Sequence, residues 1–362
     1  MSLVNKQMAE KEVDNEESAP HCQVFTIAPQ IKKRKLVIHL DLNNTILVSD
    51  AVCKQGPSAA LNVYLSTVTW GQMSDKGEWT WLNDCTSVSP SCPDAINYFS
   101  QFGRSSDFTD TPMGQCFKDV QNRHLQLLEW PGEADSVFTL LGEDKKRYHF
   151  ILPSFFHLLE RLHQQGRHFS VLLRTYGTDL ARVLPVVQAA LKGKHPLFPQ
   201  LRDVPLCVDL TPGRIRCSKR DVVLTRGSER VSTKANNKNI YDFFNTVTGI
   251  GGFQDHFDWW ARNNFSSRGG KPFWIDPNDC DVQHIFIDDN IRINEEDSIV
   301  NCQMLLQDEN GHRLRIVPTA ELYKICLVQT DLLRAIADID YFVKCIQLCE
   351  ENYDQYLSNL HE

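Results

Sequence analysis

Three short, largely apolar runs in this 362-residue chain each end in polar residues. The runs span residues 36–40, 169–173 and 283–287. An apolar run stopped by turn-forming residues is typical of a buried strand in a parallel sheet. The polar residues that follow the runs include Asp41, Thr175 and the pair Asp288 and Asp289. Because open α/β sheets bind ligands beyond the carboxyl ends of their strands, these side chains are candidates for one shared site.

The segment around the second run has an α/β rhythm. Residues 150–165 predict an amphipathic helix, with Pro153 in its first turn and Gly166 just after its end. A second helix is expected directly after the run, capped by Thr178 or Asp179. Helix, strand, turn and helix in this order form one α/β unit.

The remaining pattern is less regular. Residues 63–70 and 78–82 are rich in β-branched and aromatic side chains, and they predict a hairpin with several tryptophans nearby. An apolar stripe at 332–346 predicts a helix packed on the core. Further predicted elements are a helix at 115–130, short strands at 206–210 and 221–225, a polar turn region at 236–245, a helix at 253–263, strands at 299–306 and 314–317, and a helical region from 318 to the end.

Charge and cysteine usage narrow the possible partners. The net charge is −8 at pH 7, so the overall field does not favour nucleic acid or an anionic membrane. No apolar run approaches the ~20 residues needed to span a bilayer. The twelve cysteines contain no Cys-x-x-Cys pair, which favours ordinary thiols in a reducing, cytoplasmic compartment. The basic run 32–35 is compatible with a nuclear address, but it abuts a predicted strand, and a solvated strand entrance is the simpler interpretation.

The polar clusters recur along the chain in the order Asp41, Thr175, Lys271 and then Asp288 with Asp289. This order resembles that of the haloacid dehalogenase (HAD) superfamily of phosphotransferases. The resemblance covers residues 35–49 and 153–317 and omits the segment between them. It implies an α/β fold with a Rossmannoid parallel sheet flanked by helices, and a cap-like insertion that contains the predicted hairpin.

The resemblance also divides the chain into parts. A polar, acidic composition at the start of the sequence predicts a disordered tail. The expected parts are the tail at 1–30, the first part of the core at 31–50, the cap-like insertion at 51–148, the second part of the core at 149–320 and C-terminal helices packed on the core at 321–362.

What the resemblance implies for the site is specific to individual residues. Asp41 would be the nucleophile that attacks phosphorus and forms an aspartyl-phosphate, which water then hydrolyses. Thr175 would donate a hydrogen bond to a phosphoryl oxygen, and Lys271 would offset the crowded negative charge. Alternatives for the lysine are Lys219, Lys234 and Lys238.

The same resemblance implies a Mg²⁺ cofactor. Hard oxygen ligands at a phosphate site suit Mg²⁺, which is held by one or two carboxylates and several waters. Two adjacent carboxylates at a buried strand end would repel each other without a cation. Asn43 would contribute its backbone carbonyl. The expected metal-site residues are Asp41, Asn43, Asp288 and Asp289.

Asn43 departs from the family pattern. The family's phosphatases usually carry a second aspartate two residues after the first, where both side chains of an extended segment face one pocket. That aspartate protonates the leaving group and later activates the water. Losing general acid–base help typically costs about 10²–10⁴-fold in rate, and an amide cannot replace it.

The sequence therefore supports a Mg²⁺-dependent phosphatase or phosphotransferase acting through Asp41 on a phosphorylated small molecule or a phosphoprotein. The alternative is a weakened pseudophosphatase that binds a phosphorylated ligand or a protein partner, because of Asn43. A third interpretation is an α/β domain of unrelated function whose short motifs match by chance. The substrate and the oligomeric state are not readable from the sequence.

Overall fold

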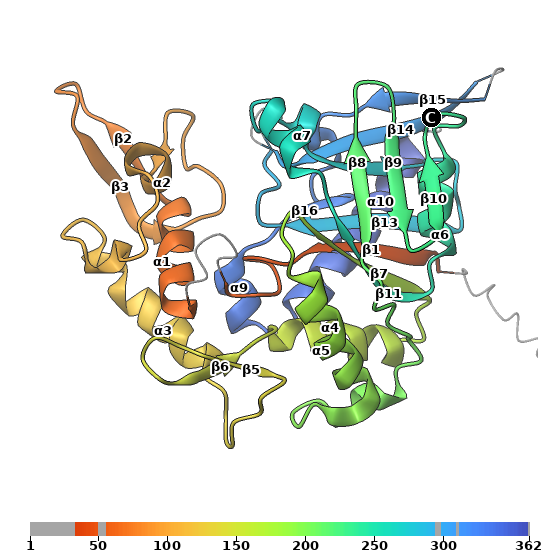
Figure 1. Cartoon of the computed structure of the whole chain (residues 1–362). Coiled ribbons are helices and arrows are strands. Elements are labelled where there is room, and N and C mark those ends of the chain that lie inside the picture. Colours follow the sequence, from red (N-terminus) through yellow and green to blue (C-terminus); the bar gives the residue numbers. More distant parts are fainter. Residues whose placement is uncertain (1–32, 50–55, 294–297, 309–310, 361–362) are drawn as a thin grey trace, which may run out of the picture. The chain divides into compact units, whose positions relative to one another are not determined.

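A mostly parallel sheet of eight strands is the centre of the fold (Figure 1). The computed structural model describes residues 33–49, 56–293, 298–308 and 311–360. The expected disordered tail at 1–30 lies outside these residues. Among the described strands of this sheet, the antiparallel pairs are β8 with β9 and β9 with β10, at one edge. In spatial order the strands are β10 (Glu229–Ser232), β9 (Val222–Arg226), β8 (Gly213–Cys217), β11 (Gly249–Gln254), β7 (Phe169–Thr175), β1 (Lys35–Asp41), β13 (Val282–Asp288) and β16 (Leu327–Gln329).

The three central strands confirm the predicted parallel sheet, and their burial explains their apolar character. Every residue of β1 and β7 is buried, because both faces of the sheet are covered. Alternate residues of β1 point to opposite faces. Ile38 belongs to the cluster that contains Leu159 and Phe342, whereas Val37 belongs to the one that contains Phe244.

Helices and a second sheet cover these two faces. The helix predicted at 150–165 is confirmed, and Gly166 follows it with a positive φ of 63°. A three-stranded sheet consists of β12 (Lys271–Ile275), β14 (Val300–Asp308) and β15 (Gly311–Ile316). The helices are α4 (Pro153–Gln164), α5 (Leu180–Ala189), α6 (Asn239–Thr246), α7 (Phe257–Arg262), α8 (Thr319–Leu322), α9 (Leu332–Ala337) and α10 (Tyr341–Leu360).

Residues 56–149, between β1 and α4, form sheets of their own, and none of their strands joins the central sheet. We refer to this segment as the insertion. Its elements are α1 (Pro57–Thr67), β2 (Thr69–Met73), β3 (Trp79–Thr86), β4 (Ile96–Asn97), α2 (Tyr98–Phe102), α3 (Lys118–Leu128), β5 (Thr139–Leu141) and β6 (Arg147–His149).

The prediction of a first hairpin strand at 63–70 is wrong. Residues 63–67 belong to helix α1, and the hairpin is formed by β2 and β3 instead. Its β-branched residues suggested a strand, but the buried positions Ala60, Leu61, Tyr64 and Leu65 follow the helical spacing. Pro57 at the start of the helix agrees with this assignment.

The tryptophans of the hairpin pack within the insertion. The ring centroids of Trp79 and Trp81 lie 4.5 Å apart, and Trp81 also packs 5.2 Å from Phe117. Tyr98 and Phe108 complete this group of rings. These side chains therefore build a small core for the insertion.

Three other predicted elements need correction. The region 236–245, expected to be polar turns, contains α6, whose Ile240, Tyr241 and Phe244 are buried on one side. The helix expected at 253–263 is shorter, because the glycine-rich strand β11 takes its beginning. The strand expected at 206–210 makes only an isolated bridge at Val208.

The C-terminal region is not entirely helical. Strand β16 pairs with the end of β13 and so extends the central sheet. Its three residues are too few to give a periodic signal in the sequence. No helix in the described part of the chain is long and apolar enough to cross a membrane. The ten described cysteines are free thiols.

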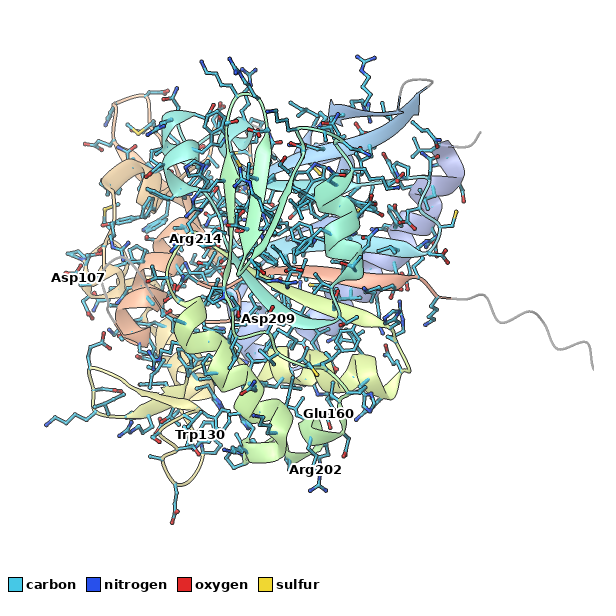
Figure 2. All side chains as sticks on the ribbon, turned by 45° about the vertical axis from the view of Figure 1, so that its right-hand side comes forward. Asp107, Trp130, Glu160, Arg202, Asp209 and Arg214 are labelled. Atoms are coloured by element: carbon cyan, nitrogen blue, oxygen red, sulfur yellow. The ribbon has the colours of Figure 1, made fainter. Side chains whose placement is uncertain are left out.

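His195 is a buried imidazole surrounded by aromatic rings. Its ring centroid lies 4.4 Å from Phe138, 4.7 Å from Phe156 and 5.6 Å from Trp130, which is labelled in Figure 2. Burial lowers the pKa of His195 to about 4, and His149 adds to the shift. Between the ordinary histidine pKa of about 6.5 and this value, the unfolded chain binds a proton that the folded protein excludes.

We expect stability to fall as the pH decreases from about 6.5 to about 4, with His195 contributing on the order of 2 kcal/mol. Asparagine cannot titrate and offers an oxygen to the Leu197 N–H, which donates to His195 Nδ1. His195→Asn should therefore show a shallower loss of unfolding free energy over this window, measured by urea denaturation at several pH values. Equal slopes in the two proteins would show that His195 does not resist protonation.

Candidate functional site

The ends of β7, β1 and β13 bring the predicted polar residues together. These strands are neighbours, and Asp41 pairs in register with Arg174 while Leu40 pairs with Ile287. Thr175 and Asp288 each follow those partners by one residue. Because adjacent strands lie ≈ 4.8 Å apart, the three side chains must meet at one edge of the sheet.

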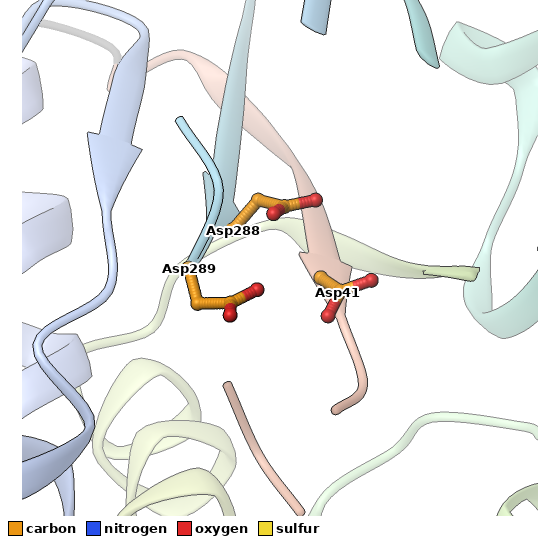
Figure 3. Close-up of side chains that lie close together, drawn as sticks. All are labelled: Asp41, Asp288 and Asp289. Atoms are coloured by element: carbon orange, nitrogen blue, oxygen red, sulfur yellow. The ribbon is translucent and has the colours of Figure 1, made fainter. Parts of the chain in front are cut away.

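Three carboxylates form the centre of the site. One oxygen from each of Asp41, Asp288 and Asp289 lies within 4.8 Å of the others. Figure 3 shows the three side chains gathered at the ends of β1 and β13. The turn after β1 supports them, because Asn44 has a φ of 55° and its amide lies 3.4 Å from Asp289 Oδ2. Asparagine tolerates this left-handed conformation better than most residues.

Lys271 reaches the same cluster from the second sheet. Its Nζ lies 2.5 Å from Asp41 Oδ1 and 2.7 Å from Asp288 Oδ2. Lys271 is the first residue of β12 and only 1% exposed, which excludes a solvated loop lysine. Gly270 permits this approach, because a β-carbon at that position would lie 2.2 Å from the backbone oxygen of Ile299.

The three alternative lysines are not in the cluster. Lys238 pairs with Asp276 at 2.6 Å. Lys219 and Lys234 are exposed. Of the four candidates, only Lys271 contacts the strand-end carboxylates.

Negative charge exceeds positive charge at the cluster. Three carboxyl groups share one ammonium, and the Arg292 guanidinium donates to the backbone oxygen of Asp289 from the far side. Burial raises the pKa of Asp41 well above its usual range, although the Lys271 ammonium opposes the shift. Burial, followed by the charge of Asp288, raises the pKa of Asp289 to about 7. Burial is the main cause of both shifts, and the neighbouring carboxylates add to them.

Lys271 responds in the complementary direction. Burial disfavours its ammonium, but the neighbouring Asp288 and Asp41 charges outweigh burial and raise the pKa of Lys271. The lysine therefore stays charged. The excess of carboxyl groups over cationic groups, together with their hard oxygen donors, fits a divalent cation held by Asp41, Asp288 and Asp289.

The other two predicted site residues lie next to the carboxylates. Thr175 is buried at the end of β7, and its Oγ1 accepts the backbone N–H of Gly177 at 2.9 Å, which leaves its hydroxyl proton available. The Asn43 side chain is held on both sides. Ser49 Oγ donates to its Oδ1 at 2.9 Å, and its Nδ2 donates to Asp179 Oδ2 at 3.3 Å.

A cleft of about 830 Å³ opens over these groups. Core residues that line it include Asp41, Asn43, Thr175, Lys271 and Asp289. The insertion contributes a second wall. Its lining residues include Pro57, Ala60, Val63, Arg104, Leu140 and Leu141. The cleft thus has one wall of polar and charged core residues and a second, mostly apolar wall from the insertion.

A buried polar network lies within the sheet next to the carboxylate cluster, and the sequence did not reveal it. Arg174 donates two hydrogen bonds to Asp255, at 2.6 and 2.9 Å, and both side chains are fully buried. Arg174 also lies 3.1 Å from His39 Nδ1, and His39 Nε2 lies 3.1 Å from His284 Nδ1. The available signal in the sequence was a polar residue inside an apolar strand, such as His39, Arg174 or His284. It did not reveal the network, because the hydrogen-bond partners are distant in sequence.

Comparisons with protein-family models, with curated proteins and with solved structures find no match to this chain. The chemistry of the site therefore rests on its own geometry.

Breaking the pair beneath the site should destabilise the protein strongly. Arg174→Met leaves Asp255 buried without its partner, and we expect a loss of about 3–5 kcal/mol in unfolding free energy. Arg202→Met is the control, because Arg202 (labelled in Figure 2) and Asp203 form an exposed pair, and such pairs contribute about 0–1 kcal/mol. The double variant Arg174→Met/Asp255→Leu should be less destabilised than Arg174→Met, as measured by urea unfolding.

Divalent cation binding can be measured without any assay of activity. We expect Mg²⁺ at about 100 times its dissociation constant to raise the unfolding free energy by about 2.7 kcal/mol. Asp288→Asn should abolish this increment, because it removes a carboxylate from the centre of the cluster. Asp107→Asn, at an exposed position labelled in Figure 2, should retain it. Equal stabilisation of the Asp288→Asn variant would place the cation elsewhere.

Proposed function

We propose that this protein is a Mg²⁺-dependent phosphatase or phosphotransferase of the HAD type that forms an aspartyl-phosphate on Asp41. The observation that carries the proposal is the contact of one buried lysine, Lys271, with two strand-end carboxylates, Asp41 and Asp288. Thr175 lines the same cleft as Asp41. Four short motifs, with as many as 134 positions from one to the next, are a stronger signal together because they meet at the carboxyl ends of neighbouring strands.

Each residue has a defined task in this reaction. Asp41 attacks phosphorus, and the bond between phosphorus and the leaving oxygen breaks. Lys271 lies against Asp41 and stabilises the negative charge that gathers as the phosphoryl group approaches. The Thr175 hydroxyl can donate a hydrogen bond to a phosphoryl oxygen, since its own oxygen already accepts the Gly177 N–H. Mg²⁺ held by Asp41, Asp288 and Asp289 would supply additional charge stabilisation for the phosphoryl oxygens.

The insertion supports the proposal as a cap over the site. It places α1 and the β5–β6 hairpin on the wall of the cleft that faces the carboxylates. Much of that wall is apolar, and a wall of this kind can select among leaving groups by shape and apolar contact. A phosphorylated small molecule fits a cleft of about 830 Å³, whereas a phosphoprotein would have to enter through an extended segment.

The pseudophosphatase alternative has its own supporting observation. Position 43 holds an amide, and that amide is fixed by Ser49 and Asp179 on its two sides. On this alternative the cleft binds a phosphorylated ligand or protein partner without turnover. It predicts saturable binding of a phosphate mimic together with no hydrolysis across a broad panel of phosphoesters.

A phosphate mimic that adds to a carboxylate tests the proposal directly. Beryllium trifluoride with Mg²⁺ should form an adduct at Asp41, detected by fluorine NMR. The adduct should disappear when Mg²⁺ is chelated and in Asp41→Asn, but it should persist in the exposed control Asp107→Asn. A folded protein that binds Mg²⁺ at the cluster and yet forms no adduct would contradict phosphoryl transfer through Asp41.

A further inference from the structure

Asp179 occupies the position that precedes helix α5, but it does not cap the helix. An aspartate at this position usually accepts a hydrogen bond from a backbone N–H in the first turn. Asp331 does so for α9, where its carboxylate accepts the Arg334 N–H at 3.1 Å. The Asp179 side chain makes no such bond with α5. Its carboxylate is therefore available for another role.

That carboxylate lies in the cleft beside position 43. Asp179 Oδ2 accepts the Asn43 amide at 3.3 Å, and both residues line the cleft together with Asp41. Ser49 holds the opposite end of the same amide. Asn43 thus has its donor group directed at Asp179. A carboxylate sits one hydrogen bond away from the point where the family pattern would place its second aspartate.

Gly177 provides the space that Asp179 uses. A β-carbon at position 177 would lie 2.6 Å from Asp179 Oδ2 and 3.4 Å from Thr175 Oγ1. These two oxygens therefore border the same small volume. Any side chain at position 177 would displace the carboxylate from Asn43. Gly177 has an ordinary backbone conformation, so the requirement is one of space.

We propose that Asp179 is the proton carrier of the site and replaces the carboxylate absent from position 43. This inference rests on the proposed function. The Asp41 oxygen bonds to phosphorus as the ester oxygen leaves, and the Asp179 carboxyl proton passes to that oxygen to give the alcohol. Asp179 then takes one proton from a water molecule whose oxygen attacks phosphorus. The bond from phosphorus to Asp41 breaks, hydrogen phosphate leaves, and both carboxyl groups regain their starting forms.

Asn43 has a positioning role in this scheme. Its amide cannot carry a proton between water and substrate, but it donates a hydrogen bond that orients Asp179. The competing explanation is that Asp179 only orients Asn43. The two explanations differ in what happens when the amide and the carboxylate exchange places.

Acetyl phosphate separates the two halves of the reaction. Its leaving group is acetate, which needs no proton, so phosphorylation of Asp41 does not require Asp179. Hydrolysis of the aspartyl-phosphate does require a base to activate water. Asp179→Asn should therefore form the phosphoprotein at an unchanged rate in Mg²⁺ and lose it about 10²-fold or more slowly. Intact-protein mass spectrometry follows both steps.

The exchanged variant Asn43→Asp/Asp179→Asn is the decisive comparison. It keeps one amide and one carboxylate in the pair, and we expect it to recover most of the lost hydrolysis rate. Asp331→Asn is the matched control at a helix start that does not line the cleft, and it should behave as the unchanged protein. Circular dichroism and the unfolding midpoint report whether each variant remains folded.

Three outcomes are distinguishable. A normal rate of dephosphorylation in Asp179→Asn overturns the inference and leaves the proposed function intact. A loss that the exchanged variant does not recover assigns Asp179 to positioning alone, which also overturns it. Failure of the unchanged protein to form any phosphoprotein, with Mg²⁺ bound, counts against the proposed function itself.

Discussion

The structure depends on the ammonium of Lys271, which lies among carboxylates inside the protein. It reaches Asp41 at 2.5 Å and Asp288 at 2.7 Å, and it is almost fully buried. A buried ammonium is costly unless it is paired, and buried carboxylates repel one another unless a cation separates them. Each group is therefore tolerable only because the other is present. These charges join the start of β12 to the ends of β1 and β13, and apolar contacts such as Phe273 against Phe286 join the two sheets deeper inside.

The part of the site built from strand ends could be predicted from the sequence. Apolar runs that stop at Asp41, Thr175 and Asp288 place these residues at one sheet edge by a general property of parallel sheets. Lys271 was harder, because four lysines fitted the spacing. Burial at the start of a strand, which the sequence did not show, separates it from the others. The identity of a bound substrate has no equivalent local signal.

The remainder was not predictable for physical reasons that differ from element to element. In α1, β-branched residues concealed a helix whose buried positions follow the helical period. Strand β16 is too short for periodicity, and it forms because β13 offers it a free edge. The contact between Asp179 and Asn43 joins residues 136 positions apart. Its presence follows from packing of α5 against the sheet, and local sequence suggested a helix cap instead.

The polar network beneath the site has a fixed direction. Arg174 can only donate, so His39 must accept at Nδ1 and donate from Nε2 to His284. His284 then donates from Nε2 to the side-chain oxygen of Asn245 at 2.6 Å. Each imidazole is thereby confined to one neutral tautomer, and all three bonds point away from the guanidinium. A second proton on either ring would face the hydrogen of a donor group that is already in place. The chain of hydrogen bonds therefore orients the side chains across the sheet but does not conduct a proton.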